Sequence, residues 1–256
     1  MVLTLSVAII TKNEEANLAR TLESVRWADE IVIVDCGSTD RTAEIAQEYG
    51  AKVFVESWKG FGAQKNSAIE KCTSDWLLAL DADEEVSAEL AGEIRQMLAG
   101  RPEQGAYFLP RRNFFLSRWV RHGGYFPDAK LRLLRRGTGL FEERIVHETI
   151  RTTGPAGRMR GSLLHHAYPT LDGYIEHMNR YSSLGAGQAL ERRKTSRGWP
   201  AFVWNVAVVP VATFAYNYFF RLGFLDGREG LLLHLYHSAY VSWKYAKAWE
   251  RDGRTT

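Results

Sequence analysis

A chain of 256 residues is long enough for one large α/β domain, or for one domain with a modest appendage. Its 45% hydrophobic and 25% charged residues are the balance of a globular protein, which excludes wholesale disorder. The net charge of +3 is too small to indicate a nucleic-acid partner, and two cysteines, Cys36 and Cys72, exclude a disulfide framework and favour a reducing cytosol.

Basic residues gather in two stretches of the sequence, 111–144 and 192–197. Such clusters favour an anionic partner, either phosphate groups or an acidic membrane surface. For the second stretch, a solvated basic face is an equal alternative. Residues 1–10 have no basic n-region and no small-residue cleavage site, so we expect a first β-strand there and not a signal peptide.

The first hundred residues alternate short apolar runs with amphipathic segments. We expect strands at 5–11, 31–34, 51–55 and 75–80, and helices at 14–26, 41–49 and 61–71. This alternation indicates βαβ units, a parallel sheet and an α/β fold. After residue 105, strand-like pieces at 106–109 and 131–134 are joined by aromatic, Gly-rich and Arg-rich loops, which is typical of a mixed-sheet extension. Residues from 171 onward are predicted to be helical.

Polar residues follow three of the predicted strands, at 11–14, 35–40 and 81–85. In an open parallel sheet the ligand lies outside the carboxyl ends of the strands, so we expect these residues to form a site. None of the three segments contains G-x-G-x-x-G or a Walker A sequence, which disfavours a dinucleotide or P-loop site.

The Asp81-Ala82-Asp83 triplet is the most specific of these strand ends. Two carboxylates separated by one residue can present hard oxygen ligands to Mg²⁺ or Mn²⁺, which would in turn bridge the phosphates of a nucleotide-sugar. D-x-D triplets are common in solvated turns, so the position after a buried strand carries the prediction.

Asp35 ends the second predicted strand. Its carboxylate can accept from a base N–H or a ribose hydroxyl, and because Asp40 or Thr39 fits the cap of the next helix, Asp35 is expected to be free for a ligand. In the segment Thr11-Lys-Asn-Glu14, Asn13 has both a helix-capping and a ligand-binding interpretation.

Four ordered motifs resemble those of the family-2 inverting glycosyltransferases. They are Val7-Ala-Ile-Ile-Thr-Lys-Asn-Glu-Glu-Ala-Asn-Leu18, Ile31-Val-Ile-Val-Asp-Cys-Gly-Ser-Thr-Asp-Arg-Thr42, Gly62-Ala-Gln-Lys-Asn66 and Leu78-Ala-Leu-Asp-Ala-Asp83. Three later segments, 125–135, 144–148 and 223–227, resemble a narrower subgroup that contains the lipopolysaccharide inner-core β-1,4-glucosyltransferases. The resemblance implies a GT-A fold and spans nearly the whole chain.

The resemblance also implies roles for the strand-end residues. Asp35 would lie near the base and ribose, Asp81 near the ribose or the metal's water shell, and Asp83 would be a metal ligand. Lys65 stands where many members have arginine, so it keeps the charge near the nucleotide but lacks the planar fork. The residues expected to bind the nucleotide-sugar are Thr11, Asn13, Glu14, Asp35, Lys65, Asp81, Ala82, Arg132, Arg135 and Arg144.

Inversion at the sugar carbon requires a general base for the acceptor hydroxyl. Glu148 is the first candidate, because such enzymes begin their acceptor-side element there, and Asp128 is the second. His147 either orients Glu148 or is structural. In many GT-A enzymes a late histidine reaches the metal or the diphosphate. Adjacent residues on a strand face opposite sides, so at most one of His165 and His166 can have this role. We expect it to be His166.

The C-terminal part is predicted to bind a membrane surface. Residues 199–220 are uncharged but contain two prolines, two asparagines and many aromatics, a composition that favours an interfacial helix over a spanning one. Residues 228–249 form a second helical stretch, and a transmembrane span or a buried dimer contact are the alternatives. We therefore predict a 1–170 catalytic domain, with the donor on 1–104 and the acceptor on 105–170, and a helical extension at 171–256.

The resemblance, together with the apolar C-terminal part, implies a UDP-sugar-dependent hexosyltransferase at the cytoplasmic face of a bacterial inner membrane. The expected donor is UDP-glucose and the expected acceptor is the lipopolysaccharide core. Alternatives are a polyprenyl phosphate or another surface glycan as acceptor, and a membrane scaffold on a retired transferase fold. A nucleotidyltransferase would need a Gly-rich loop after the first strand, where this chain has Thr-Lys-Asn-Glu-Glu.

Overall fold

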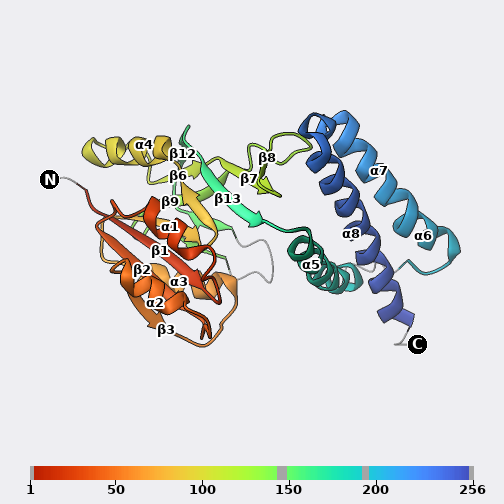
Figure 1. Cartoon of the computed structure of the whole chain (residues 1–256), viewed down its shortest axis with the longest axis horizontal. Coiled ribbons are helices and arrows are strands. Elements are labelled where there is room, and N and C mark those ends of the chain that lie inside the picture. The colour runs from red at the N-terminus through yellow and green to blue at the C-terminus, as the bar shows by residue number, and fades with distance from the viewer. Residues whose placement is uncertain (1–2, 143–148, 192–195, 254–256) are drawn as a thin grey trace. The chain divides into compact units, whose positions relative to one another are not determined.

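The computed structural model describes residues 3–142, 149–191 and 196–253 (Figure 1). The chain forms two compact units. The sheet unit comprises Met1–Arg112 and Asp128–His165, and the helical unit comprises Asn113–Pro127 and His166–Thr256. The excursion 113–127 therefore packs with the helical unit, which differs from the contiguous division predicted at residue 170.

Strands and helices alternate at the start of the sheet unit, as predicted. They are β1 (Leu5–Thr11), α1 (Leu18–Ser24), β2 (Glu30–Asp35), α2 (Thr42–Glu48), β3 (Lys52–Val55), α3 (Phe61–Glu70) and β4 (Trp76–Asp81). The four strands lie in the order β4-β1-β2-β3 and all pair in parallel. The predicted mostly parallel sheet is confirmed.

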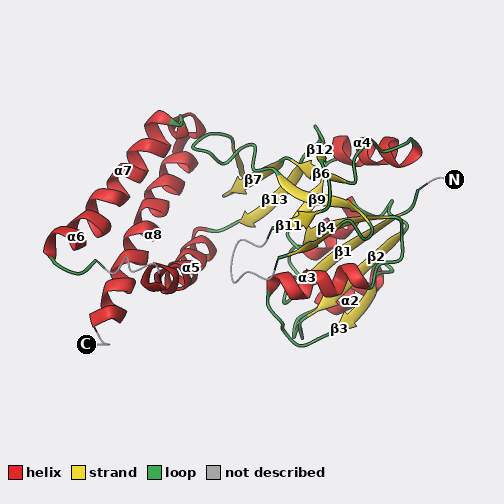
Figure 2. Ribbon diagram, turned by 180° about the vertical axis from the view of Figure 1, so that it is seen from behind, coloured by secondary structure: helices red, strands yellow, loops and turns green. Residues whose placement is uncertain are grey.

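Alternating side chains of the strands form two apolar layers. Val7 and Ile9 of β1 pack with α1 and with Leu90 of the helix at Ala88–Ala99. Ala8 packs on the other face with Ala68 of α3. Figure 2 shows α3 lying against that second face of the sheet. The central strands are therefore buried on both sides, which explains their continuous runs of Val, Ile and Leu.

The register of the parallel strands aligns their carboxyl ends. Thr11 at the end of β1 is opposite Asp35 of β2, and Ile10 is opposite Asp81 of β4. The polar segments that follow β1, β2 and β4 therefore emerge at the same edge of the sheet.

The antiparallel strand β9 joins the parallel strands to a mixed extension. The strands here are β6 (Ala106–Leu109), β9 (Lys130–Arg135) and β12 (Ala156–Arg158), with a separate hairpin of β10 (Gly139–Phe141) and β11 (Ile150–Thr152). β9 pairs antiparallel with β4 and β6, and Trp76 at the amino end of β4 is opposite Arg135. Arg132 and Arg135, both in β9, therefore lie toward different edges of the sheet.

A short antiparallel pair brings the last strand of the sheet unit back to the end of β4. β5 (Glu84–Val86) pairs with β13 (Leu163–Tyr168), and His165 is opposite Glu84. Between them, α4 (Ala88–Ala99) begins at Ser87, whose hydroxyl accepts from the backbone N–H of Leu90.

The helical unit is built around two long helices, α5 (Leu171–Glu191) and α8 (Gly227–Gly253). The helical stretch Trp199–Phe220, called here the apolar helix, contains α6 (Trp199–Val203), α7 (Val209–Ala215) and two π-helical turns, and it packs along α8. Pro210 has no N–H for the carbonyl of Val206, and the hydroxyl of Ser242 in α8 donates to that carbonyl at 2.8 Å. β7 (Arg111–Phe115) leaves the sheet unit and pairs with β8 (Arg118–Val120).

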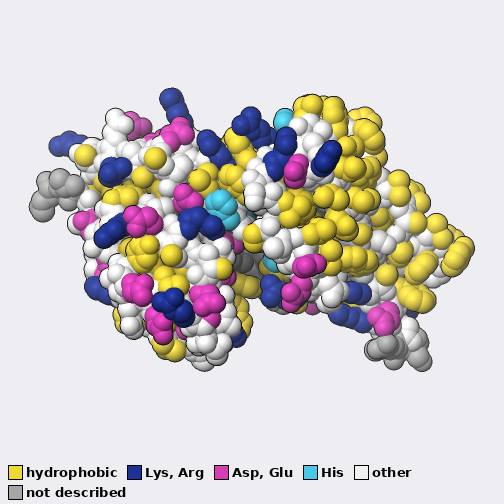
Figure 3. Space-filling model, viewed as in Figure 1, with side chains coloured by type: hydrophobic (Ala, Val, Ile, Leu, Met, Phe, Trp, Pro, Cys, Tyr) yellow, Lys and Arg dark blue, Asp and Glu magenta, His cyan; other side chains and the backbone are white. Residues whose placement is uncertain are grey.

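The helical unit exposes many large apolar side chains (Figure 3). Trp199, Val211 and Phe220 of the apolar helix are 76%, 67% and 79% exposed. Other exposed apolar residues of this unit are Trp204, Tyr216, Phe219, Leu222, Phe224, Leu225, Leu231, Leu235 and Trp249. A contiguous apolar surface of this kind marks an interaction site in a folded protein.

The backbone at Gly161, two residues before β13, packs closely against Leu90 of α4. Substitution of this glycine therefore tests the packing that positions β13. A Cβ on Gly161 would lie 2.4 Å from the Cα of Leu90, whereas a Cβ on Gly92 of α4 would meet nothing within 4 Å. Gly161→Ala should therefore destabilise the protein by about 1–3 kcal/mol, and Gly92→Ala should be neutral or stabilise it by about 0.5–1 kcal/mol. Thermal unfolding measures both changes, and equal effects would contradict the packing described.

Candidate active site at the carboxyl ends of the strands

Asp81, at the end of β4, is held between two cations. Its carboxylate lies 2.7 Å from Nζ of Lys65 on α3 and 2.5 Å from a guanidinium nitrogen of Arg132 on β9. Burial raises the pKa of Asp81, but the charges of Arg132 and Lys65 outweigh that effect and hold the pKa well below its usual range. Asp81 is therefore a carboxylate at neutral pH, with a quarter of its side chain exposed.

Glu84 is fully buried beneath Asp81 and connects the strands around it. Its carboxylate accepts from Arg111 at 3.0 Å and from Arg132 at 3.4 Å. It also accepts from the backbone N–H of Asp81 at 3.0 Å, which fixes the turn that carries the triplet. A buried carboxylate needs such partners, because an isolated charge in the interior costs several kcal/mol.

Asp83 pairs with His165 of β13. Nε2 of the imidazole lies 3.3 Å from the carboxylate of Asp83. Burial raises the pKa of Asp83, whereas the hydrogen bond and charge of His165 lower it, and the net effect is a decrease. The histidine beside the triplet is thus His165 and not the predicted His166, whose ring stacks on Phe114 at 4.7 Å, because neighbouring residues of β13 face opposite ways.

Asp35 is engaged within the protein and not free as predicted. One carboxylate oxygen accepts from the backbone N–H groups of Gly37 and Ser38, and the other accepts from the hydroxyls of Thr11 and Ser38. Thr11 is thereby turned toward Asp35. A ligand hydroxyl or N–H would bind here by exchanging with one of these hydroxyls.

Asn13 and Glu14 connect the loops that follow β1 and β2. Asn13 accepts from the backbone N–H of Thr39, and the backbone N–H of Glu14 donates to the hydroxyl of Thr42. Asn13 therefore does not cap the helix that follows it. Burial raises the pKa of Glu14 above its usual value.

Asp128 is ion-paired on both sides. Arg111 lies 2.6 Å from its carboxylate and Lys130 lies 2.9 Å away. Although burial raises the pKa of Asp128, these two cations lower it to about 2. A carboxylate with so low a pKa is a weak base, so the geometry disfavours Asp128 as the proton acceptor. Arg144, His147 and Glu148 lie outside the described residues.

The pairing of β9 removes Arg135 from this cluster. Arg135 is opposite Trp76, five residues before Asp81 along β4, which corresponds to about 16 Å at the usual rise of a strand. Arg135 therefore belongs to the amino edge of the sheet, whereas Arg132 reaches Asp81. Ala82 is buried, and its carbonyl accepts from the hydroxyl of Thr21.

The chain is similar in sequence to known glycosyltransferases. Residues 6–163 match the family described as "Glycosyl transferase family 2". The chain is 36% identical over 237 residues to the "Lipopolysaccharide core biosynthesis glycosyltransferase LpsC" of Rhizobium meliloti, covering 88% of this chain and 82% of that protein. It is 30% identical over 240 residues to the "Uncharacterized glycosyltransferase RT0209" of Rickettsia typhi, covering 89% and 80%. The chain belongs to glycosyl transferase family 2.

The fold of this family-2 glycosyltransferase also resembles a solved structure. Staphylococcus aureus TarS 1-349, solved in complex with UDP, superposes with a TM-score of 0.50 at 15% identity, over 99% of this chain and 92% of that one. At that identity the likeness concerns the fold alone, and it agrees with the mostly parallel sheet seen here. The predicted GT-A fold is confirmed.

Three further residues complete the cluster around the D-x-D triplet: Glu84, Arg111 and His165. Glu84 directly follows the triplet in a strand-end segment already singled out as polar. His165 is one of two adjacent histidines, and the other, His166, was predicted for this role. Arg111 stands out in the sequence only as one member of a basic stretch, because its partner Glu84 lies 27 residues away.

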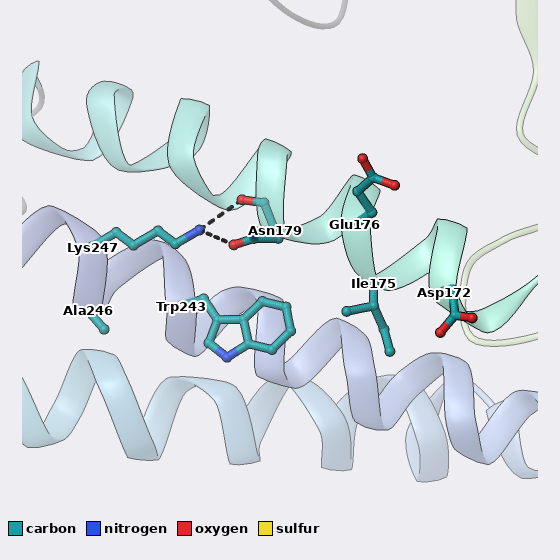
Figure 4. Close-up of a pocket in the computed structure, with 7 residues that line it drawn as sticks. All are labelled: Asp172, Ile175, Glu176, Asn179, Trp243, Ala246 and Lys247. Carbon is teal, nitrogen blue, oxygen red and sulfur yellow. Dashed lines mark hydrogen bonds between the residues drawn. The ribbon is translucent and has the colours of Figure 1, made fainter.

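A groove in the helical unit of this glycosyltransferase is a separate concave surface (Figure 4). It has a volume of about 490 Å³ and is lined by Asp172, Ile175, Glu176 and Asn179 of α5 and by Trp243, Ala246 and Lys247 of α8. The ammonium of Lys247 donates to Asn179 and to the hydroxyls of Ser182 and Ser183, so it holds the two helices together. The groove contains none of the strand-end residues.

The low pKa of Asp128 makes stability depend on pH. A folded-state pKa of about 2, below the unfolded value of about 3.9, contributes stability above about pH 4 that is lost as the pH falls toward 2. Asp128→Asn should lower the unfolding temperature at neutral pH. The free energy of unfolding of the variant should be about 2 kcal/mol below that of the wild type at neutral pH. This difference should disappear between about pH 4 and pH 2 when unfolding is measured across that range. A difference that stays constant over that range would contradict the ion pairing.

Proposed function

We propose that this family-2 glycosyltransferase transfers glucose from UDP-glucose to an inner-core heptose of a lipid-linked lipopolysaccharide glycan by metal-assisted single displacement. The Asp83–His165 pair, at the end of β4 within a cluster of paired charges, carries the proposal. Two similar proteins support it: LpsC is named for lipopolysaccharide core biosynthesis, and TarS was solved with UDP and with UDP-GlcNAc.

The charges of the cluster explain why the donor should bring a metal. Among the described residues, the cations Lys65, Arg111, Lys130 and Arg132 are ion-paired with Asp81, Glu84 and Asp128. Asp83 pairs with His165, and burial together with the charges of Asp83 and Asp81 helps to raise the pKa of nearby Glu14. The cations of the cluster are therefore already paired with carboxylates. A diphosphate would add negative charge, which is then best compensated by a divalent cation that arrives with it.

The side chains at the end of β4 fit a divalent metal. Asp83 offers a carboxylate and His165 an imidazole nitrogen, whereas Asp81 is occupied by Lys65 and Arg132. Over the described residues no group of three or more His, Cys, Asp or Glu is placed to hold a metal, so the diphosphate would supply further ligands. When bound, Mg²⁺ or Mn²⁺ would neutralise charge on the leaving diphosphate.

The protein's own residues supply the rest of the site. Lys65 and Arg132 are held in place by Asp81, so their positive charges are preorganised to stabilise a leaving UDP. The Asp35 pocket, with Thr11 and Ser38, suits a ribose hydroxyl or a base N–H. Because Asp128 is a weak base here, Glu148 remains the proposed acceptor of the proton from the attacking hydroxyl.

The apolar surface of the helical unit supports binding to a membrane. By length and composition the apolar helix could cross a bilayer, and only 6% of its most apolar 18 residues are buried. Its exposed aromatics and two prolines favour a position in the interface. We propose that this unit lies in the cytoplasmic leaflet of the inner membrane, which would confine the enzyme to the plane of a lipid-linked acceptor.

Substitution of Asp83 tests the donor site. Asp83→Ala should lower metal-dependent UDP release from UDP-glucose by about 100-fold or more, and EDTA should do the same to the wild type. Asp75→Ala is the matched control, because Asp75 precedes the same strand at its other end, where it bonds Thr4. The proposal fails if the Asp83 variant retains metal-dependent turnover, or if no UDP-sugar in a panel is turned over by the wild type.

Substitution of Val211 tests the membrane surface. Val211→Glu should weaken flotation with vesicles that contain anionic lipids by about fivefold, because one negative charge facing such a surface costs about 1 kcal/mol. Val55→Glu is the control, since Val55 is equally exposed, at 72%, but lies in the sheet unit. Equal flotation of the two variants would remove the proposed membrane surface.

A further inference from the structure

The excursion 113–127 leaves the sheet unit after Arg112, and the chain returns to that unit at Asp128. It begins two residues after Arg111 and ends directly before Asp128, and these two residues form a 2.6 Å ion pair within the sheet unit. Within the excursion, the segment Arg118–Phe126, called here the HGGY loop after His122–Tyr125, packs in the helical unit. None of the roles proposed above uses this loop.

A buried carboxylate holds the loop at His122. Asp226, which is 2% exposed, accepts from the backbone N–H groups of Arg121 and His122 and from Nδ1 of the His122 imidazole at 2.9 Å. A buried aspartate that binds two backbone N–H groups and a ring nitrogen fixes both the chain and the orientation of the ring.

The glycines after His122 allow close packing that fixes the loop further. Gly123 has a φ of 65°, and its N–H donates to the carbonyl of Arg221 at 2.8 Å. A Cβ on Gly123 would lie 2.1 Å from the buried ring of His234, and one on Gly124 would lie 2.2 Å from the guanidinium of Arg221. No side chain larger than hydrogen fits either position without movement of its neighbours, so the loop has one tightly specified conformation.

His122 is the member of this arrangement that can meet a ligand. A third of its side chain is exposed, in contrast to the 3% of Asp226. With Nδ1–H donated to Asp226, the neutral ring carries its lone pair on Nε2, which has no protein partner among residues 3–142, 149–191 and 196–253. This is the arrangement in which a carboxylate presents an imidazole nitrogen for an outside hydroxyl.

Other side chains of the same loop suit a carbohydrate. The guanidinium of Arg121 stacks 4.0 Å from the ring centre of Trp119, and Phe126 packs edge-on against the same indole. Aromatic rings, an arginine and an oriented imidazole within one loop offer apolar contact together with donors and an acceptor, which is the mixed chemistry that a glycan presents.

We infer that the HGGY loop binds the acceptor glycan, with Nε2 of His122 accepting a hydrogen bond from an acceptor hydroxyl and Asp226 acting as the positioning residue for that ring. This inference rests on the proposed function and names the acceptor contact of the same enzyme. It involves no proton transfer: His122 orients the glycan, and deprotonation of the nucleophile stays with the base proposed above.

The test separates acceptor binding from donor binding. Steady-state transfer is measured with UDP-glucose and a deacylated lipopolysaccharide inner-core oligosaccharide, for the wild type, His122→Phe and Asp226→Asn. The ratio of acceptor KM to donor KM should rise about five- to tenfold in each variant, the loss that corresponds to one hydrogen bond. The side-chain amide introduced by Asp226→Asn would keep the two backbone hydrogen bonds but donate to Nδ1, which moves the ring proton to Nε2 and removes the acceptor.

A double variant and a control complete the experiment. The His122→Phe/Asp226→Asn double variant should show no larger change in the KM ratio than either single variant, because both act through one nitrogen. His177→Phe, which replaces a histidine that stacks on Tyr181 in the same unit, is the control. An unchanged KM ratio in His122→Phe with normal wild-type transfer would overturn the inference and leave the proposed function intact. Absence of any UDP-glucose turnover by the wild type would overturn both.

Discussion

Carboxylates that leave water must be paired, and this requirement organises the centre of the sheet unit. Glu84 is fully buried and Asp81 is three-quarters buried, so the chain surrounds them with Arg111, Arg132 and Lys65, each from a different element. The same ion pairs join α3, β4, β7 and β9 at one edge. Removing a single partner would leave an uncompensated charge, which makes the position of the D-x-D triplet a property of the whole cluster.

The parallel sheet and the donor side of the site could be predicted because the information is local. Buried strands are continuous apolar runs, and polar residues directly after them must emerge at the carboxyl edge. Asp35, Asp81 and Asp83 were identified in that way, and the register of β1 with β2 and β4 brings them to one edge. The resemblance to family 2 added Lys65, which the structure places on Asp81.

The rest depends on pairings between distant parts of the chain, which a single sequence does not encode locally. The choice between His165 and His166 is decided by the register of β13 with β5, which places His165 opposite Glu84. The choice between Arg132 and Arg135 is decided by the antiparallel register of β9 with β4. The hydrogen bonds from the hydroxyls of Thr11 and Ser38 to Asp35 likewise become visible only in the folded structure. For the same reason, nothing in the sequence indicated that residues 113–127 would join the helical unit.

Diffraction from crystals grown with UDP and Mn²⁺ tests the central claim most directly, because the anomalous signal of manganese locates the metal independently of activity. The pairing of charges around β4 predicts one anomalous peak between the diphosphate and the pair formed by the Asp83 carboxylate and the His165 imidazole, with Lys65 and Arg132 still at Asp81. A diphosphate bound at the carboxyl edge of the sheet with no metal on Asp83 would contradict it.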